Sequence, residues 1–242
     1  MFKRLPLALA LALALAIFAT GLAFAKAPGR ATPSTQYMAN EGLMVVHGET
    51  KVVFDPLFRN GFGQYQLLPK EMEDALFAGE PPFDGIDAVF VSHYHGDHFS
   101  PVDMLRLLVE QPAIRLYAPA QAVTVLRSVA GKQDEKVLER VTAVELAYKD
   151  APVSMEMDGL IIEAVRIPHS GWPEGRLDVE NISWRVTLNE TTTVGVHVLV
   201  SMPKNPSLRP RQYRDFDLFT EPGETRDIFV SIPLDVREAG TN

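Results

Sequence analysis

Short apolar runs alternate with turn residues through the middle of the chain, and the spacing inside each run predicts its secondary structure. Runs of about four to eight apolar and β-branched residues predict strands, whereas apolar residues three and four positions apart predict helices. Strands are expected over 42–47, 51–55, 86–92, 115–118, 141–147, 153–157, 160–167, 182–188 and 191–200. Helices are expected over 71–78 and 119–130, and another is expected to begin at residue 101. The alternation of the two kinds of element predicts a mixed α/β fold.

Turn and cap residues support these boundaries. Gly-Glu-Thr at 48–50 predicts a hairpin between the first two strands. Ser100 is suited to cap the helix that follows it, with Asp103 reaching back as its partner. Because no internal repeat or low-complexity linker divides the middle of the chain, residues 38–200 are expected to form one domain.

The N-terminus has the pattern of a signal peptide. Two basic residues precede a nearly unbroken Leu/Ala run over 5–22, and Ala-Phe-Ala at 23–25 supplies the small residues that a signal peptidase reads. Residues 1–25 are therefore predicted to be a cleaved signal peptide, followed by a flexible N-terminal segment over 26–37. The alternative is a retained membrane anchor, since the run approaches the ~20 residues that span a bilayer. Cleavage predicts an exported protein, periplasmic or secreted, without stable membrane association.

Composition and charge exclude several classes of protein. The chain has no cysteine, which excludes disulfide scaffolds, cysteine-ligated zinc sites and thiol nucleophiles. With 23 basic and 31 acidic residues the formal net charge is −8, so no general attraction to nucleic acid is expected. A small molecule is the expected substrate, and the oligomeric state is left open.

The candidate chemistry lies in one short segment. Residues 92–98 are Ser-His-Tyr-His-Gly-Asp-His, and they follow an apolar strand and precede a capped helix. In extended backbone His93 and His95 point the same way and can hold one metal ion. The glycine allows a turn that brings Asp97 and His98 to a second ion or to a water. Imidazole and carboxylate without sulfur suit Zn²⁺, with Fe or Mn²⁺ as alternatives. The competing interpretation is a histidine-rich surface loop that binds metal adventitiously.

His169 is a candidate third ligand. It follows the strand predicted over 160–167, which is the same strand-end position that the first cluster occupies. Three neutral protein ligands leave one coordination position of a zinc ion open for water, as catalytic sites require. The alternative is an ordinary loop histidine with no role in metal binding.

His-x-His-x-Asp-His directly after a strand resembles the signature of the metallo-β-lactamase superfamily. Further stretches of the chain are similar to its hydrolase branches related to lactonases and phosphodiesterases, namely Asn40-Glu41-Gly42, Phe54-Asp55-Pro56 and residues 87–92 and 167–171. The resemblance implies an αββα sandwich over residues 38–200, with metal ions at one edge between the two sheets.

The resemblance also implies a ligand set. His93, His95 and His169 would hold the first metal ion, and Asp97 and His98 would serve the second. One or two zinc ions are the expected cofactors, with iron or manganese as alternatives.

The same resemblance implies roles for two aspartates and a reaction. Asp55 would stand behind the ligands and steady a ring nitrogen or the loop. Asp97 would orient a metal-bound hydroxide and accept its proton in the hydrolysis of an ester, lactone or phosphodiester-type substrate. The alternative function is a catalytically degenerate metal- or ligand-binding protein on the same fold.

The C-terminal part departs from the superfamily pattern. A complete two-metal site has a later bridging aspartate and a final histidine, but residues 198–203 hold no carboxylate and no histidine follows His197. Residues 201–242 therefore form a divergent C-terminal segment, expected to be incomplete or irregular. Three explanations are open: a mononuclear site, loss of catalysis, or a reading-frame shift near residues 190–200. Translation of the other two forward frames tests the third.

Four aromatic residues on nearby loops are candidates either for a pocket wall or for plain packing. They are Phe62, Tyr65, Tyr94 and Trp172.

Overall fold

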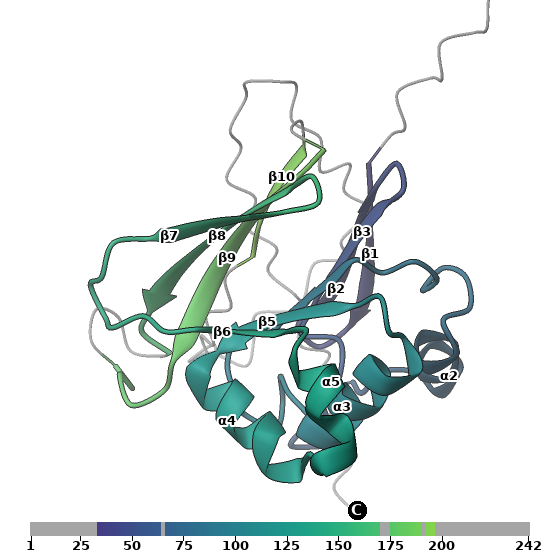
Figure 1. Cartoon of the computed structure of the whole chain (residues 1–242), viewed down its shortest axis with the longest axis horizontal. Coiled ribbons are helices and arrows are strands. Elements are labelled where there is room, and N and C mark those ends of the chain that lie inside the picture. The colour runs from purple at the N-terminus through teal and green to yellow at the C-terminus, as the bar shows by residue number, and fades with distance from the viewer. Residues whose placement is uncertain (1–32, 64–65, 170–174, 190–191, 197–242) are drawn as a thin grey trace, which may run out of the picture. The chain divides into compact units, whose positions relative to one another are not determined.

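The computed structural model describes residues 33–63, 66–169, 175–189 and 192–196 (Figure 1). The predicted signal peptide over 1–25 and the divergent segment over 201–242 lie outside the described residues. Within the described part, none of the helices combines the length and the apolar character needed to cross a membrane.

The first sheet has six strands in the order β1-β2-β3-β4-β5-β6. They are β1 (Ser34–Ala39), β2 (Gly42–His47), β3 (Thr50–Phe54), β4 (Ala88–Phe90), β5 (Arg115–Pro119) and β6 (Val141–Val144). The first three pair antiparallel, and β3 to β6 pair parallel. Phe54 pairs with Phe90, so the carboxyl ends of β3 and β4 lie side by side.

Helices connect the parallel strands, because such strands cannot be joined by a tight turn. They are α2 (Lys70–Ala78), α3 (Pro101–Glu110), α4 (Ala120–Val129) and α5 (Glu135–Leu138), with a 3₁₀ turn at Lys132–Asp134. All of them cover one face of the first sheet (Figure 1). The side chain of Ser100 accepts a hydrogen bond from the Asp103 N–H at the start of α3, which confirms the predicted cap. Met104 and Leu107 of this helix are fully buried.

The second sheet packs on the other face of the first. Its strands are β7 (Val153–Met157), β8 (Leu160–Ile167), β9 (Asn181–Leu188) and β10 (Thr192–Val196), antiparallel in the order β10-β9-β8-β7. Aromatic rings fill the space between the sheets. The centroid of the Phe90 ring lies 5.1 Å from Phe54, 5.3 Å from Tyr117 and 5.2 Å from Trp184. These buried rings stabilise the contact between the two sheets.

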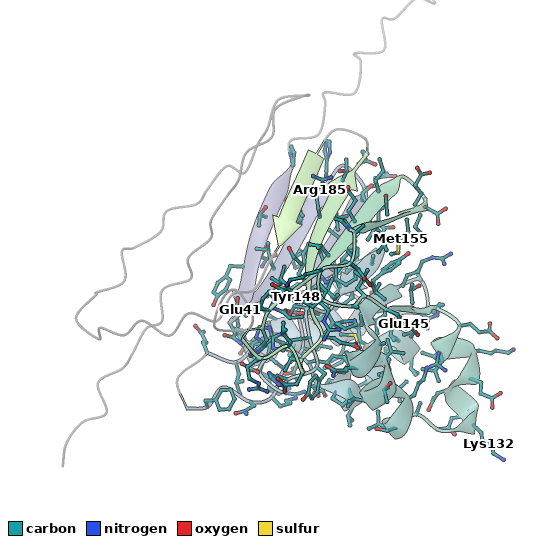
Figure 2. All side chains as sticks on the ribbon, turned by 90° about the vertical axis from the view of Figure 1, so that its left-hand side faces the viewer. Glu41, Lys132, Glu145, Tyr148, Met155 and Arg185 are labelled. Carbon is teal, nitrogen blue, oxygen red and sulfur yellow. The ribbon has the colours of Figure 1, made fainter. Side chains whose placement is uncertain are left out.

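One helical layer and two packed sheets form a mixed α/β fold consistent with the αββα sandwich that the resemblance implies, which confirms the predicted fold class. Figure 2 shows Lys132 among the helices and Arg185 on the strands of the second sheet. Of the helices in the described part of the chain, none covers the outer face of the second sheet.

The N-terminal boundary of the domain differs from the prediction. Residues 34–37 belong to β1, so the prediction of a flexible segment over 26–37 is wrong for them. Thr35 pairs with Val45 across the antiparallel ladder. The polar start of this strand has no alternating pattern that would predict a strand. Its extended conformation is instead stabilised by pairing with β2.

Two predicted strands are shorter than expected. The strand expected over 86–92 is reduced to Ala88–Phe90, and the one expected over 141–147 ends at Val144. Leu146 is nevertheless buried between the sheets. Leu146 is therefore apolar because it is buried, and not because it belongs to a strand.

Candidate metal centre

The segment after β4 contacts both sheets, and it carries the histidine motif. The Val91 N–H donates to Tyr117 O of the first sheet at 2.9 Å, and Ser92 O accepts from the Ile182 N–H of the second sheet at 2.9 Å. The indole N–H of Trp184 donates to Val91 O at 3.1 Å. The motif therefore begins where the two sheets meet.

A tight turn brings the later residues of the motif back to the earlier ones. The His98 N–H donates to His95 O at 3.0 Å, which closes the turn. The oxygen of Gly96 accepts from the backbone N–H groups of Arg59 and Asn60 at 3.1 and 2.9 Å. These two hydrogen bonds hold the loop of residues 59–60 against the turn of the motif.

His93, His95 and His169, called here the first group, converge on one point. His169 Nε2 lies 3.1 Å from His93 Nε2 and 3.2 Å from His95 Nδ1. Their rings are nearly perpendicular to one another, with interplanar angles of 82°, 75° and 80°. Nitrogen ligands about 2.0–2.1 Å from a tetrahedral ion are roughly 3.3 Å apart. The spacing of the first group thus fits one shared metal ion.

Burial keeps the first group in the neutral form that metal ligation requires. It lowers the pKa of His93 far below its usual value, with further lowering from the neighbouring imidazoles. Burial also lowers the pKa of His95. For His169, burial and the neighbouring His95 lower the pKa to about 4. All three imidazoles therefore present unprotonated nitrogens at neutral pH.

Asp97 and His98, called here the second group, lie beside the first. The nitrogen Nε2 of His98 is 3.7 Å from Asp97 Oδ2, and ligand atoms of both residues lie within 4.8 Å of one on His93. His98 Nε2 is buried and has no hydrogen-bond partner among the described residues. A buried polar atom normally has a partner, and a metal ion would supply one here. The donor set of nitrogen and carboxylate oxygen fits zinc, iron or manganese.

The charge around His98 differs from that around the first group. Burial alone would lower the pKa of His98, but the hydrogen bond to Asp55 and the charges of Asp55, Asp97 and Glu41 outweigh it and raise the pKa. Burial raises the pKa of the Glu41 carboxyl group, which is labelled in Figure 2. The second group is therefore surrounded by acidic side chains.

Asp55 lies behind the histidines, at the end of β3. Its side chain is buried, and its backbone is in the left-handed region with φ of 39°. Oδ1 accepts from the Ser92 N–H at 2.7 Å, and Oδ2 accepts from Ser92 Oγ at 2.5 Å and from His98 Nδ1 at 3.0 Å. The structure thus brings together all six residues singled out from the sequence. Their roles as ligands and supporting residues stay predictions.

Two further residues hold the site and were not assigned a role from the sequence. Ser92 contacts Asp55 and two histidines, and the side-chain amide of Asn40 donates to Asp97 O at 2.7 Å. Ser92 opens the motif, and Asn40 lies in a stretch that carries the resemblance. A polar residue next to a ligand motif was the available signal in both cases.

The candidate pocket residues have different surroundings. Phe62 is 59% exposed, whereas Tyr94 is half-buried with its ring centroid 4.7 Å from that of His95. Tyr94 also lines a surface hollow of about 380 Å³ beside the start of α4. Tyr65 and Trp172 lie outside the described residues.

The stretch in which the superfamily has its later ligands is not described beyond Val196. Residues 198–203 and His197 lie outside the described residues. The mononuclear, degenerate and frame-shift explanations therefore stay hypotheses.

Three solved structures are distantly similar to this chain. A putative metal-dependent hydrolase of Parabacteroides distasonis is 16% identical with a TM-score of 0.43, covering 67% of this chain and 59% of that chain. The metallo-hydrolase Igni18 of Ignicoccus hospitalis is 18% identical with a TM-score of 0.43, covering 65% and 57%. The diiron β-hydroxylase CmlA of Streptomyces venezuelae is 18% identical with a TM-score of 0.40, covering 69% and 30%. The chain spans less than two thirds of each.

The family assignment rests on a sequence model of a protein family. The model described as the beta-lactamase superfamily domain matches residues 50–197, which is more than half of the chain. The matched stretch contains Asp55, the motif over 92–98 and His169. Comparison with curated proteins gives no match. The chain therefore belongs to the β-lactamase superfamily of metallo-hydrolases.

Proposed function

We propose that this protein is an exported metal-dependent hydrolase that acts on a small ester, lactone or phosphodiester-type substrate. One observation carries the proposal: nitrogen atoms of His93 and His95 lie 3.1 and 3.2 Å from Nε2 of His169, which comes from the other sheet. Three neutral imidazoles at this spacing would leave one coordination position of a tetrahedral metal ion open for water, as in catalytic sites. A structural site fills all four positions with protein ligands. The absence of a basic excess supports a small-molecule substrate over nucleic acid.

The proposal gives the residues of the site two roles, which are binding of the metal ion and transfer of a proton. When bound, a metal ion supplies an acidified water and polarises the scissile carbonyl or phosphoryl oxygen. The first group holds that ion. Asp97 has a half-buried carboxylate beside His98 and a backbone held by Asn40, so it is positioned to orient a water and to accept its proton. Were a second ion bound, Asp97 and His98 would be among the residues that hold it.

Zinc is the proposed metal, because the donors are imidazole nitrogen and carboxylate oxygen and the chain has no cysteine. Iron and manganese accept the same donors. One of the similar solved structures is named as a diiron enzyme, which supports testing iron alongside zinc.

A second candidate function is a catalytically degenerate metal- or ligand-binding protein on the same fold. The observation that favours it is in the sequence: residues 198–203 hold no carboxylate, and no histidine follows His197. A protein that retains the first group without the later ligands would bind one ion and have no bridging carboxylate.

Metal analysis combined with a hydrolysis screen separates the two functions. The purified full chain is analysed for zinc, iron and manganese and is assayed with ester, lactone and phosphodiester probes. Stoichiometric metal with turnover that His93→Ala abolishes supports the hydrolase. One ion without turnover supports the binding protein, and no stoichiometric metal overturns both.

A control histidine is available in the same chain. His47 lies at the opposite end of the β2–β3 hairpin from Asp55, since it pairs with Thr50. The His47→Gln variant is expected to keep the metal content and the turnover of the unsubstituted protein.

A further inference from the structure

Ser92 is held rigidly between the two sheets. It is 3% exposed, its N–H donates to Asp55 Oδ1 at 2.7 Å, and its carbonyl accepts from the Ile182 N–H at 2.9 Å. Hydrogen bonds to its N–H and its carbonyl group fix the backbone of Ser92 in place.

The hydroxyl of Ser92 contacts three polar groups. Oγ lies 2.5 Å from Asp55 Oδ2, 3.0 Å from His93 Nδ1 and 3.3 Å from His98 Nδ1. His93 belongs to the first group and His98 to the second. One hydroxyl therefore faces a histidine of each group.

Counting the protons fixes the direction of each hydrogen bond. An ionised carboxylate only accepts, so the single hydroxyl proton of Ser92 points to Asp55. The oxygen of Ser92 can then only accept from His93, so Nδ1 of His93 carries the proton. Asp55 Oδ2 likewise accepts from Nδ1 of His98 at 3.0 Å. In the neutral form of both rings Nε2 is left without a proton, and for His98, whose pKa is raised, this form prevails only above that pKa.

Each unprotonated Nε2 faces a proposed metal position. Nε2 of His93 lies 3.1 Å from His169 Nε2, and Nε2 of His98 is buried without a partner among the described residues. Asp55 reaches His98 directly, but it reaches His93 only through the hydroxyl of Ser92. The two groups thus depend on Ser92 to different extents.

We propose that Ser92 is a positioning residue that holds His93 in its Nδ1–H form. Its hydroxyl donates to Asp55, and its oxygen is thereby left to accept the hydrogen bond from His93 Nδ1. The proposal rests on the proposed function to the extent that a metal ion is what the Nε2 atoms hold. Ser92→Ala removes the only partner of His93 Nδ1 that the described residues supply, whereas His98 keeps Asp55.

Nitrogen-15 NMR of the imidazoles in the metal-free full chain tests the proposal without any metal. At a pH above the raised pKa of His98, the expected result is an Nδ1–H form at both His93 and His98, and in Ser92→Ala a loss of that preference at His93 alone. An Nε2–H form at His93 in the unsubstituted protein overturns the proposal, as does an unchanged His93 in Ser92→Ala.

Zinc titration against a chromophoric chelator gives the functional readout. Removal of a group that orients a ligand weakens metal binding by about 10–100-fold, which is the loss expected for the first ion in Ser92→Ala. Ser92→Thr keeps a hydroxyl and should restore the affinity to within about threefold. Equal affinities in the alanine, threonine and unsubstituted proteins would contradict the proposal.

Ser100→Ala is the matched control. Ser100 is also buried, but its hydroxyl caps α3 and contacts none of the histidines. It should lower stability and leave the imidazole spectra and the zinc affinity unchanged. Failure of the proposed function would show as absence of stoichiometric metal in the unsubstituted protein, whereas failure of the Ser92 proposal shows in the NMR spectra of the metal-free chain.

Discussion

The two groups of the metal centre are built in different ways. The first group takes His93 and His95 from the loop after β4 and His169 from the end of β8, so it exists only when both sheets are packed together. The second group, Asp97 and His98, comes from a single turn that nearby acidic residues surround. Burial lowers the pKa values of the first group, whereas the carboxylates raise that of His98.

This difference predicts different behaviour. The first group presents neutral lone pairs and depends on long-range packing. The second group is local, and its negative surroundings attract a cation even when packing between the sheets is weakened. Substitutions in each group should therefore show whether a loss of metal affinity is accompanied by a loss of fold stability.

The largest effect is expected from His169→Ala, because it removes the contribution of the second sheet to the first group. The affinity for the first ion should fall further than the loss of about 10–100-fold that is typical when a supporting residue is removed. Hydrolysis should fall to background. Metal analysis after dialysis measures the first outcome, and retention of a full complement of metal would contradict it. His47→Gln serves as the control.

Asp55→Ala is expected to destabilise the fold most strongly. It leaves the N–H and the hydroxyl group of Ser92 buried without the acceptor that Asp55 supplies. Each such group costs about 1–3 kcal/mol, so the free energy of unfolding should fall by about 3 kcal/mol. Urea denaturation measures it. Asp74→Ala, which breaks an exposed ion pair with Lys70, should leave the free energy of unfolding nearly unchanged. Equal effects of the two variants would refute this account of Asp55.

In the metal-free protein the two groups respond to acid in opposite directions. The pKa of His169 is lowered from 6.5 to about 4, so the unfolded chain binds its proton first and stability falls as the pH drops through this window. The pKa of His98 is raised, so its contribution is fully present below its unfolded pKa and is lost as the pH rises through its folded pKa.

On the acid side His98 is protonated in both the folded and the unfolded chain, so the histidines with a lowered pKa set the pH dependence there. Between pH 6.5 and 4 we expect the free energy of unfolding to fall by about 1–2 kcal/mol from His169 alone, allowing for its partial exposure. Urea denaturation in the presence of a chelator measures the slope, which His169→Ala should reduce. An identical slope in both proteins would show that the first group does not titrate as described.

The smallest effect is expected from Asn40→Gly, which touches the second group alone. Asn40 has φ of 44°, a conformation that glycine adopts without strain, so the substitution removes little besides the hydrogen bond to Asp97 O. The free energy of unfolding should fall by about 1 kcal/mol. Zinc titration should show a weaker second ion and an unchanged first ion. A weaker first ion instead would mean that the groups are not independent.

Local sequence signals predicted much of this centre because they report local geometry. The alternation of side chains along extended backbone places His93 and His95 on one side, and the cap at Ser100 marks where the following helix begins. The position of His169 just after a strand was a weaker signal. It succeeded because strand ends of both sheets meet at the same edge.

Features that depend on distant contacts were not predictable in the same way. Ser92 acquires its role from Asp55, 37 positions earlier, and from Ile182 of the second sheet. β1 has a polar start, and its order comes from pairing with β2. Neither contact leaves a periodic trace in the sequence, so only the folded structure reveals it.

X-ray absorption spectroscopy of the protein loaded with one equivalent of zinc tests the central claim most directly. Three imidazole nitrogens at about 2.0–2.1 Å are expected in the unsubstituted protein, and two in His169→Ala. The same number of imidazole ligands in both proteins would contradict a metal centre shared between the two sheets.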